Sequence, residues 1–162
     1  MGRRPVPPDQ IVTVLGESPQ RIAAITSPLT PDAALRSPAP GEWSANEVLA
    51  HLRCCADVWG GCIATIVRGD RPTIRAVNPT TYIHDTDYVD RPFASSLRAF
   101  AAQRTDLLAV LESLVPEHWA LDATVTGAGA PLTRSVHAYA ERLSTHERAH
   151  WKQLAKIVRL LT

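Results

Sequence analysis

The sequence has no long apolar run and no excess of one charge. None of its apolar segments approaches the ~18 residues of a membrane span, and the first residues lead into no apolar signal-peptide core. We therefore expect a cytoplasmic protein without a membrane helix. The net charge is +1 with the signs mixed, which argues against a basic stripe for nucleic acid or anionic membrane. The expected partner is a small molecule.

Cysteine is also scarce. The three cysteines, Cys54, Cys55 and Cys62, are odd in number and crowded together, which is not the pattern of a disulfide framework. We find no strand-like alternation, internal repeat or low-complexity tract. The 162 residues are long enough to bury a core, and we expect a single all-α domain over residues 1–162.

Four amphipathic helices are predicted from the spacing of the apolar residues, after an irregular arm over residues 1–8. Their expected ranges are 9–26, 44–67, 92–115 and 133–161. A kink is expected near residues 16–19, where a glycine and a Ser-Pro pair interrupt the first helix. The long connection over residues 68–91 indicates a crossover between the second and third helices, because antiparallel neighbours in a bundle need only a few residues.

The start of the second helix carries the strongest local signal. Ser44, followed three residues later by Glu47, forms the capping-box pattern of a helix N-terminus. The helix that follows places His51 on an apolar face together with Cys55 and Trp59. A histidine is thus predicted to face the core.

A second histidine signal, His146-Glu147-Arg148-Ala149-His150, lies near the C-terminus. Two histidines four residues apart on a helix share one face, so both imidazoles can reach one metal ion. This segment also matches the H-E-x-x-H signature of zinc proteases, in which the glutamate is the general base. The residues after His150 contain no histidine or carboxylate, so a third ligand must come from earlier in the chain.

His51 can supply this third ligand. Three neutral imidazoles leave one coordination position open for water or a substrate atom, as in catalytic metal sites. The alternative is that these histidines are hydrogen-bonded core residues.

Three blocks of sequence, in this order and separation, resemble the DinB-like superfamily of metal-binding four-helix bundles over about residues 9–160. They are Gly41-Glu-Trp43-Ser44-Ala-Asn-Glu47-Val-Leu-Ala-His51-Leu, an Arg-x-x-Leu-Leu pattern at Arg104, and His146-x-x-x-His150. The resemblance implies an up-down-down-up bundle with the crossover after the second helix. It also implies a divalent ion, usually zinc or nickel, held by His51, His146 and His150. Relatives include mycothiol-dependent maleylpyruvate isomerase and the bacillithiol transferases.

Two charged residues are candidate catalytic residues. Glu147 can act as a base toward metal-bound water, support a ligand, or pair with an arginine. Arg104 lies in an apolar stripe and needs a partner, because a buried guanidinium alone is costly. It can bind a ligand carboxylate or pair with Glu47 or Glu147, and we favour a structural pair.

Three further residues have two interpretations each. Cys55 can approach the ion one helical turn from His51, although a small buried cysteine more often only packs. Tyr139 can line a pocket or fill the core. His84, in the long connection, either adds a ligand or has no role.

Three functions stay open. The first is a metal-dependent transferase or isomerase that uses a low-molecular-weight thiol such as mycothiol. The second is a hydrolase with Glu147 as the base, and the third is a non-catalytic, stress-related metal or ligand-binding bundle, working as a homodimer. We identify no residues for an organic cofactor. A pocket that opens from solvent to the ion would favour chemistry.

Overall fold

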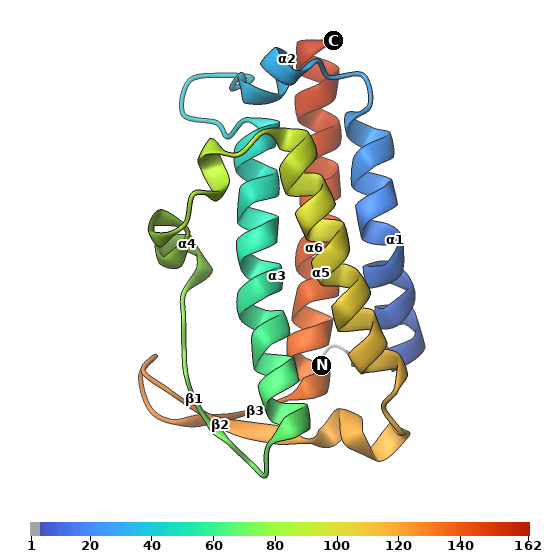
Figure 1. Ribbon diagram of the computed structural model, residues 1–162, viewed down its shortest axis with the longest axis vertical. Helices are drawn as coiled ribbons and strands as arrows, with labels where there is room; N and C mark the ends of the chain where they lie inside the picture. Colours follow the sequence, from blue (N-terminus) through green and yellow to red (C-terminus); the bar gives the residue numbers. More distant parts are fainter. Residues whose placement is uncertain (1–3) are drawn as a thin grey trace.

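The structure is a computed structural model that describes residues 4–162. The long helices of the chain pack side by side (Figure 1). They are α1 (Pro8–Thr26), α3 (Ala45–Arg68), α5 (Phe93–Glu112) and α6 (Val136–Leu161). The chain runs up α1, down α3 and α5, and up α6 (Figure 1). The predicted four-helix bundle is confirmed, and residues 1–3 of the predicted arm lie outside the described residues. None of the described helices is long and apolar enough to cross a membrane.

Helix α1 continues through the interruption noted in its sequence, from Pro8 to Thr26. Pro19 has no backbone N–H, so the carbonyl of Leu15, four residues earlier, cannot accept its usual helical hydrogen bond. Arg104 of α5 donates to that carbonyl instead, from Nη1 at 3.0 Å. The bond missing from α1 is thus replaced by a contact between α1 and α5.

Helix α3 begins at the predicted capping box. The hydroxyl of Ser44 accepts from the backbone N–H of Glu47 at 3.1 Å, and the carboxylate of Glu47 accepts from the N–H of Ser44 at 2.7 Å. Both groups satisfy donors that a helix N-terminus leaves free. This fixes the start of α3 two turns before His51. A short helix, α2 (Pro31–Leu35), precedes it.

The apolar core divides into two clusters along the bundle. One lies where α1 begins and contains Ile11, Leu15 and Ile63, and the other lies where α1 ends and contains Ile22 and Phe100. Burial of each such side chain contributes roughly 1.5–3 kcal/mol. A group of buried polar side chains lies between them: Ser18, Arg104, Ser144 and Glu147.

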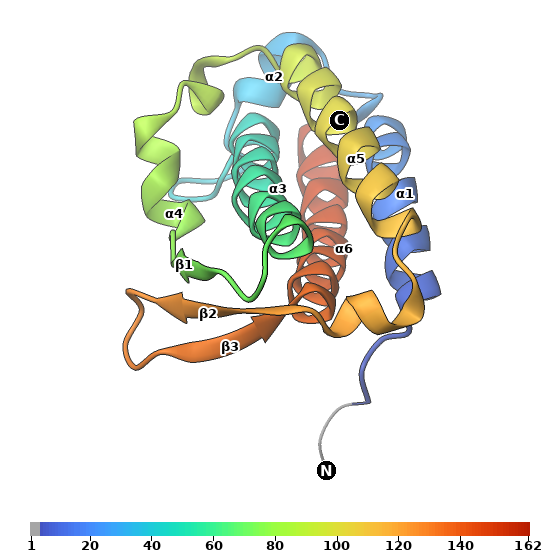
Figure 2. The same cartoon turned by 60° about the horizontal axis from the view of Figure 1, so that its bottom comes forward.

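A small sheet crosses the end of the bundle where α3 ends and α6 begins (Figure 2). It contains β1 (Thr73–Arg75), β2 (Asp122–Thr126) and β3 (Leu132–Ser135) in this order. Strand β1 pairs with β2 in parallel, and β2 pairs with β3 antiparallel.

The sequence prediction of no strands was therefore wrong, and so was the predicted start of the last helix. Thr133 lies in β3, and α6 begins at Val136, where Ser135 caps it by accepting from the N–H of Ala138 at 3.1 Å. Ala123 and Val125 are the buried residues of β2. This alternation is too short to be recognised among neighbouring glycines, and β1 is distant in sequence. The third long helix also ends earlier than predicted, at Glu112.

The connection between α3 and α5 lies beside the outer face of α3 (Figures 1 and 2). It carries β1, the short helix α4 (Pro79–Tyr82) and two single 3-10 turns. The hydroxyl of Tyr88 donates to Asp57 at 2.5 Å, and the side-chain amide of Asn46 donates to the carbonyl of Val89 at 2.8 Å. These contacts hold the connection against α3.

Candidate metal centre

The structure brings together the three histidines that the sequence singled out. His51 comes from α3, and His146 and His150 come from α6. Nε2 of His146 lies 3.1 Å from Nε2 of His51 and 3.1 Å from Nε2 of His150. The rings of His51 and His150 have centroids 5.1 Å apart. Three ring nitrogens thus face a common region between two helices.

Two tryptophans flank this histidine cluster. The ring of Trp43 lies 5.2 Å from that of His51, and the ring of Trp59 lies 5.2 Å from that of His146. Indole rings at these distances limit rotation of the imidazoles and cover part of the cluster from solvent. The cluster is therefore held by packing on two sides.

Burial keeps the imidazoles neutral. It lowers the pKa of His51 to about 4, with a smaller contribution from His150. It lowers the pKa of His146 to about 3, with smaller contributions from His150, His51 and Arg142. The pKa of His150 is also lowered by burial, partly offset by Gln153 and Glu147. Neutral imidazole is the form that binds metals, because its free nitrogen carries a lone pair.

The arrangement of these nitrogens fits a divalent cation. Nε2 of His146 faces two other ring nitrogens, and a single proton on it can serve only one of these contacts. A cation accepts lone pairs from all three. Four-coordinate zinc, with bonds of about 2.0–2.1 Å, separates its nitrogen ligands by about 3.3 Å, which is close to the two separations from His146.

Cys55 is a fourth candidate donor. Its sulfur lies 3.6 Å from Nε2 of His51, and one ligand atom each from His51, Cys55 and His146 lie within 4.8 Å of one another. Burial raises the pKa of this thiol to about 12, with a smaller contribution from Cys54. The sequence placed Cys55 one turn from His51, and the structure brings its sulfur into the cluster.

Gln153, which was not predicted from the sequence, orients one of the histidines. The amide oxygen of Gln153 lies 2.7 Å from Nδ1 of His150. Because that oxygen can only accept, Nδ1 is the protonated nitrogen, and Nε2 is left free toward the cluster. The only signal in the sequence is the spacing of three residues on one helix.

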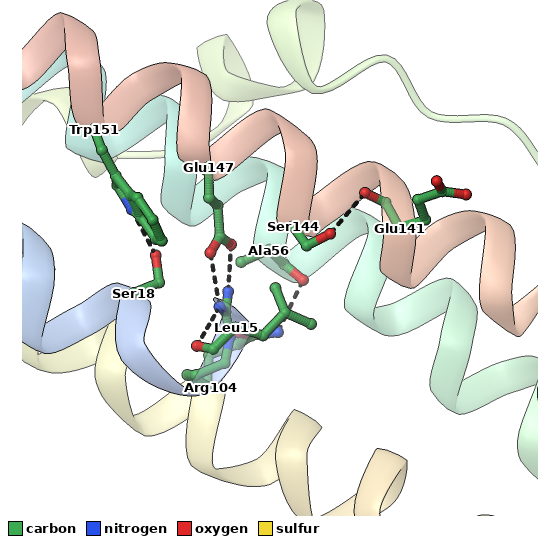
Figure 3. Close-up of polar contacts among 9 residues, drawn as sticks. Leu15, Ser18, Ala56, Arg104, Glu141, Ser144, Glu147 and Trp151 are labelled. Carbon is green, nitrogen blue, oxygen red and sulfur yellow. Dashed lines mark hydrogen bonds and ion pairs between the residues drawn. The ribbon is translucent and has the colours of Figure 1, made fainter. Parts of the chain in front are cut away.

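Arg104 and Glu147 form a buried ion pair (Figure 3). Nη1 donates to Oε2 at 2.8 Å, and Nη2 donates to Oε1 at 2.5 Å. Each side chain is 1% exposed. The structural pair favoured from the sequence is therefore present, with Glu147 rather than Glu47 as the partner. Both carboxylate oxygens of Glu147 are engaged by the guanidinium, and the pair joins α5 to α6.

The remaining candidate residues lie elsewhere. His84 is exposed in a 3-10 turn of the connection and does not belong to the histidine cluster. Tyr139 is buried on α6, two turns before His146.

The histidine cluster can be reached from solvent. A groove of about 400 Å³ is open beside His150. It is lined by Gly41, Glu42, Trp43, His150, Gln153, Lys156 and Ile157. A small molecule in this groove would contact one of the candidate ligands directly.

Comparison with known proteins agrees with this fold. The family model of the DinB superfamily matches residues 15–154, whereas comparison with curated proteins gives no match. The structure of YfiT from Bacillus subtilis, described as a probable metal-dependent hydrolase with an unusual four-helix bundle topology, matches with a TM-score of 0.81. That match covers 98% of this chain and 91% of YfiT at 15% identity, which shows a shared fold. The chain belongs to the DinB superfamily.

Proposed function

We propose that this protein is a divalent-metal-dependent transferase or isomerase that uses a low-molecular-weight thiol such as mycothiol. The supporting observation is the three-nitrogen cluster beside an open groove. Three neutral nitrogen ligands leave a position for an atom from solution. A divalent ion held there, zinc or nickel, supplies the Lewis acidity that favours the thiolate form of the cosubstrate.

The residues of the chain have separate roles in this proposal. His51, His146 and His150 hold the ion, and Gln153 keeps the donor nitrogen of His150 free. Trp59 packs against the ring of His146 and limits its rotation. The ion pair of Arg104 and Glu147 fixes α6, which carries two of the ligands, against α5.

Hydrolysis is the second candidate, because YfiT is described as a probable metal-dependent hydrolase. With Glu147 as the base, it would need a carboxylate oxygen free to accept a proton from water. Both oxygens of Glu147 already accept from Arg104. A thiol cosubstrate needs no such base, and this difference favours transfer.

The test is conjugation of monochlorobimane with mycothiol, bacillithiol or glutathione by zinc-loaded and nickel-loaded protein. We expect metal-dependent conjugation with at least one thiol, lost in His146→Ala and kept in His84→Ala, since His84 is exposed away from the cluster. No turnover with any of the three thiols would contradict the proposal. Ester hydrolysis that is lost in Glu147→Gln, with metal retained, would support the hydrolase instead.

Whether the thiol of Cys55 binds the metal distinguishes a non-catalytic site from a catalytic one. Ligation by this thiol in addition to three histidines would close a four-coordinate site, as in structural zinc sites. Cobalt-substituted protein would then show a sulfur-to-cobalt charge-transfer absorption that Cys55→Ser removes. We expect an open site, with no such absorption and with the metal retained in Cys55→Ser.

A further inference from the structure

A second cleft, of about 340 Å³, lies between α3, α6 and the β2–β3 hairpin. We call it the hairpin cleft. Trp59 forms its wall on the side of the metal centre, because the same indole contacts the ring of His146. Much of the remaining wall is apolar and includes Val58, Val77, Val125 and Leu132. Within residues 4–162, no aspartate or glutamate lines the cleft.

Two arginines line the hairpin cleft without a carboxylate partner. Arg134 comes from β3 and Arg142 from α6, and the guanidinium of Arg142 lies 4.5 Å from the centre of the Trp59 ring. Neither side chain belongs to an ion pair among residues 4–162. Guanidinium groups bind carboxylates and phosphates through paired hydrogen bonds. Two guanidinium groups without an ion pair in a largely apolar cleft therefore favour an oxyanion.

Tyr139 adds a neutral donor to the same cleft. Its side chain is 5% exposed and lines the cleft together with Cys62. Burial, followed by the neighbouring Cys62 thiol, raises the pKa of the Tyr139 hydroxyl to about 12. The hydroxyl thus keeps its proton at neutral pH and can donate a hydrogen bond to an anion in place of its present hydrogen bond with Cys62.

The cleft and the metal centre share one face of each helix. On α6, Tyr139, Arg142 and His146 follow one another at spacings of three and four residues, which place them on one side of a helix. On α3, Trp59 lies two turns after His51. Arg142 is thus one turn from His146 and two turns from His150, at about 5.4 Å per turn, which is the length of a small organic molecule.

We propose that the hairpin cleft binds the carboxylate or phosphate end of a small organic anion, whose apolar body extends along Trp59 toward the metal centre. Arg134 and Arg142 bind the oxyanion, Tyr139 donates to it, and Trp59 packs against the apolar body. A cleft of this volume matches the size range of small-molecule sites, about 300–1,000 Å³. This inference rests on the proposed function and names its electrophilic substrate as an organic anion.

The test uses calorimetric titration of metal-free protein, so that coordination to an ion cannot cause the binding. The probes are benzoate, phenyl phosphate and the neutral benzamide, which is similar in shape to benzoate. We expect at least one anion to bind at least tenfold more tightly than benzamide. Arg142→Gln and Arg134→Gln should each weaken binding of that anion at least tenfold, and neither should lower zinc affinity. Arg148→Gln is the matched control, since Arg148 is exposed on α6 outside the cleft.

Two results would overturn the proposal: equal binding of both anions and benzamide, or anion binding that neither cleft variant weakens. Tighter binding of benzoate would show that the cleft prefers a carboxylate, and tighter binding of phenyl phosphate that it prefers a phosphate. Circular dichroism checks that the variants fold, as expected for arginines without ion pairs. Selective anion binding without thiol conjugation would support the hairpin cleft as an anion site and contradict the proposed function. Thiol conjugation without selective anion binding would support the proposed function and contradict the anion site.

Discussion

The buried ion pair of Arg104 and Glu147 shows how single residues stabilise this bundle. Removing two charges from water is costly, and the cost is offset only by good geometry and further hydrogen bonds. Here the carboxylate is held through both oxygens, and Arg104 also donates to the carbonyl of Leu15 that Pro19 leaves free. The pair thus depends on a proline in a third helix.

Removal of one partner of this pair should be strongly destabilising. Glu147→Ala leaves a buried guanidinium without its carboxylate, and we expect the free energy of unfolding to fall by about 3–5 kcal/mol. The double variant Arg104→Met, Glu147→Leu removes both charges and should recover most of that loss. Urea denaturation measures the free energy of unfolding of the single and the double variant. A single variant within about 1 kcal/mol of the wild type would contradict a structural role for the pair.

Gln153 is expected to affect metal affinity without touching the ion. Gln153→Ala removes the acceptor that fixes the proton on Nδ1 of His150. Loss of such a partner typically lowers metal affinity about 10–100-fold, and we expect a decrease of about this size here. Competition with a chromophoric chelator gives the affinity. Lys152→Ala, at an exposed neighbouring position, serves as the control and should leave it unchanged. Equal affinities in both variants would exclude a positioning role for Gln153.

Residue types and spacing made His51, His146 and His150 candidates for one site, because histidines on apolar helical faces are unusual, and the family resemblance joined them as ligands. These signals gave no means of finding Gln153 or the two arginines of the hairpin cleft. Glutamine and arginine at helix positions are typical of solvent-facing surfaces. Only the packing of α3, α6 and the hairpin shows what surrounds them.

At the scale of elements, the start of α3 determines where His51 lies. Ser44→Ala removes the hydroxyl that caps this helix, and we expect a loss of about 1 kcal/mol in the free energy of unfolding. Ser37→Ala, at an exposed position outside the helices, is the matched control and should lie within about 0.5 kcal/mol of the wild type. Thermal or urea unfolding of the metal-free proteins compares them. Equal stability of the two variants would contradict the capping role.

The helices could be predicted because their apolar spacing is sustained over many turns, with a clear start signal at Ser44. The strands could not. Each is short, and β1 pairs with β2, which lies beyond the whole of α5 in the sequence. Pairing between distant segments depends on the folded bundle, which brings the ends of α3 and α5 to the same side (Figure 1).

At the scale of the whole molecule, stability of the metal-free protein should depend on pH. The pKa values of His51 and His146 are lowered to about 4 and about 3, against about 6.5 in an unfolded chain. Below pH 6.5 the unfolded state therefore binds more protons than the folded state, and the free energy of unfolding falls as the pH falls toward 4.

Thermal unfolding of metal-free protein between pH 7.5 and 5 checks this dependence. This range lies above the ordinary titration of carboxylates. We expect the melting temperature to fall with the pH in the wild type, and to fall less in His146→Gln, which has lost one of the titrating groups. A melting temperature that is constant over this range would contradict the burial of neutral histidines.

Binding of one divalent ion by histidines from two helices is the central claim, and metal analysis of untagged protein tests it most directly. Zinc or nickel is measured by mass spectrometry after dialysis, in the wild type and in three variants. We expect one equivalent per chain in the wild type and in His84→Ala, and loss of the ion in His51→Ala and His146→Ala. Metal-free wild-type protein that takes up no divalent ion, or full occupancy in His51→Ala, would contradict the account.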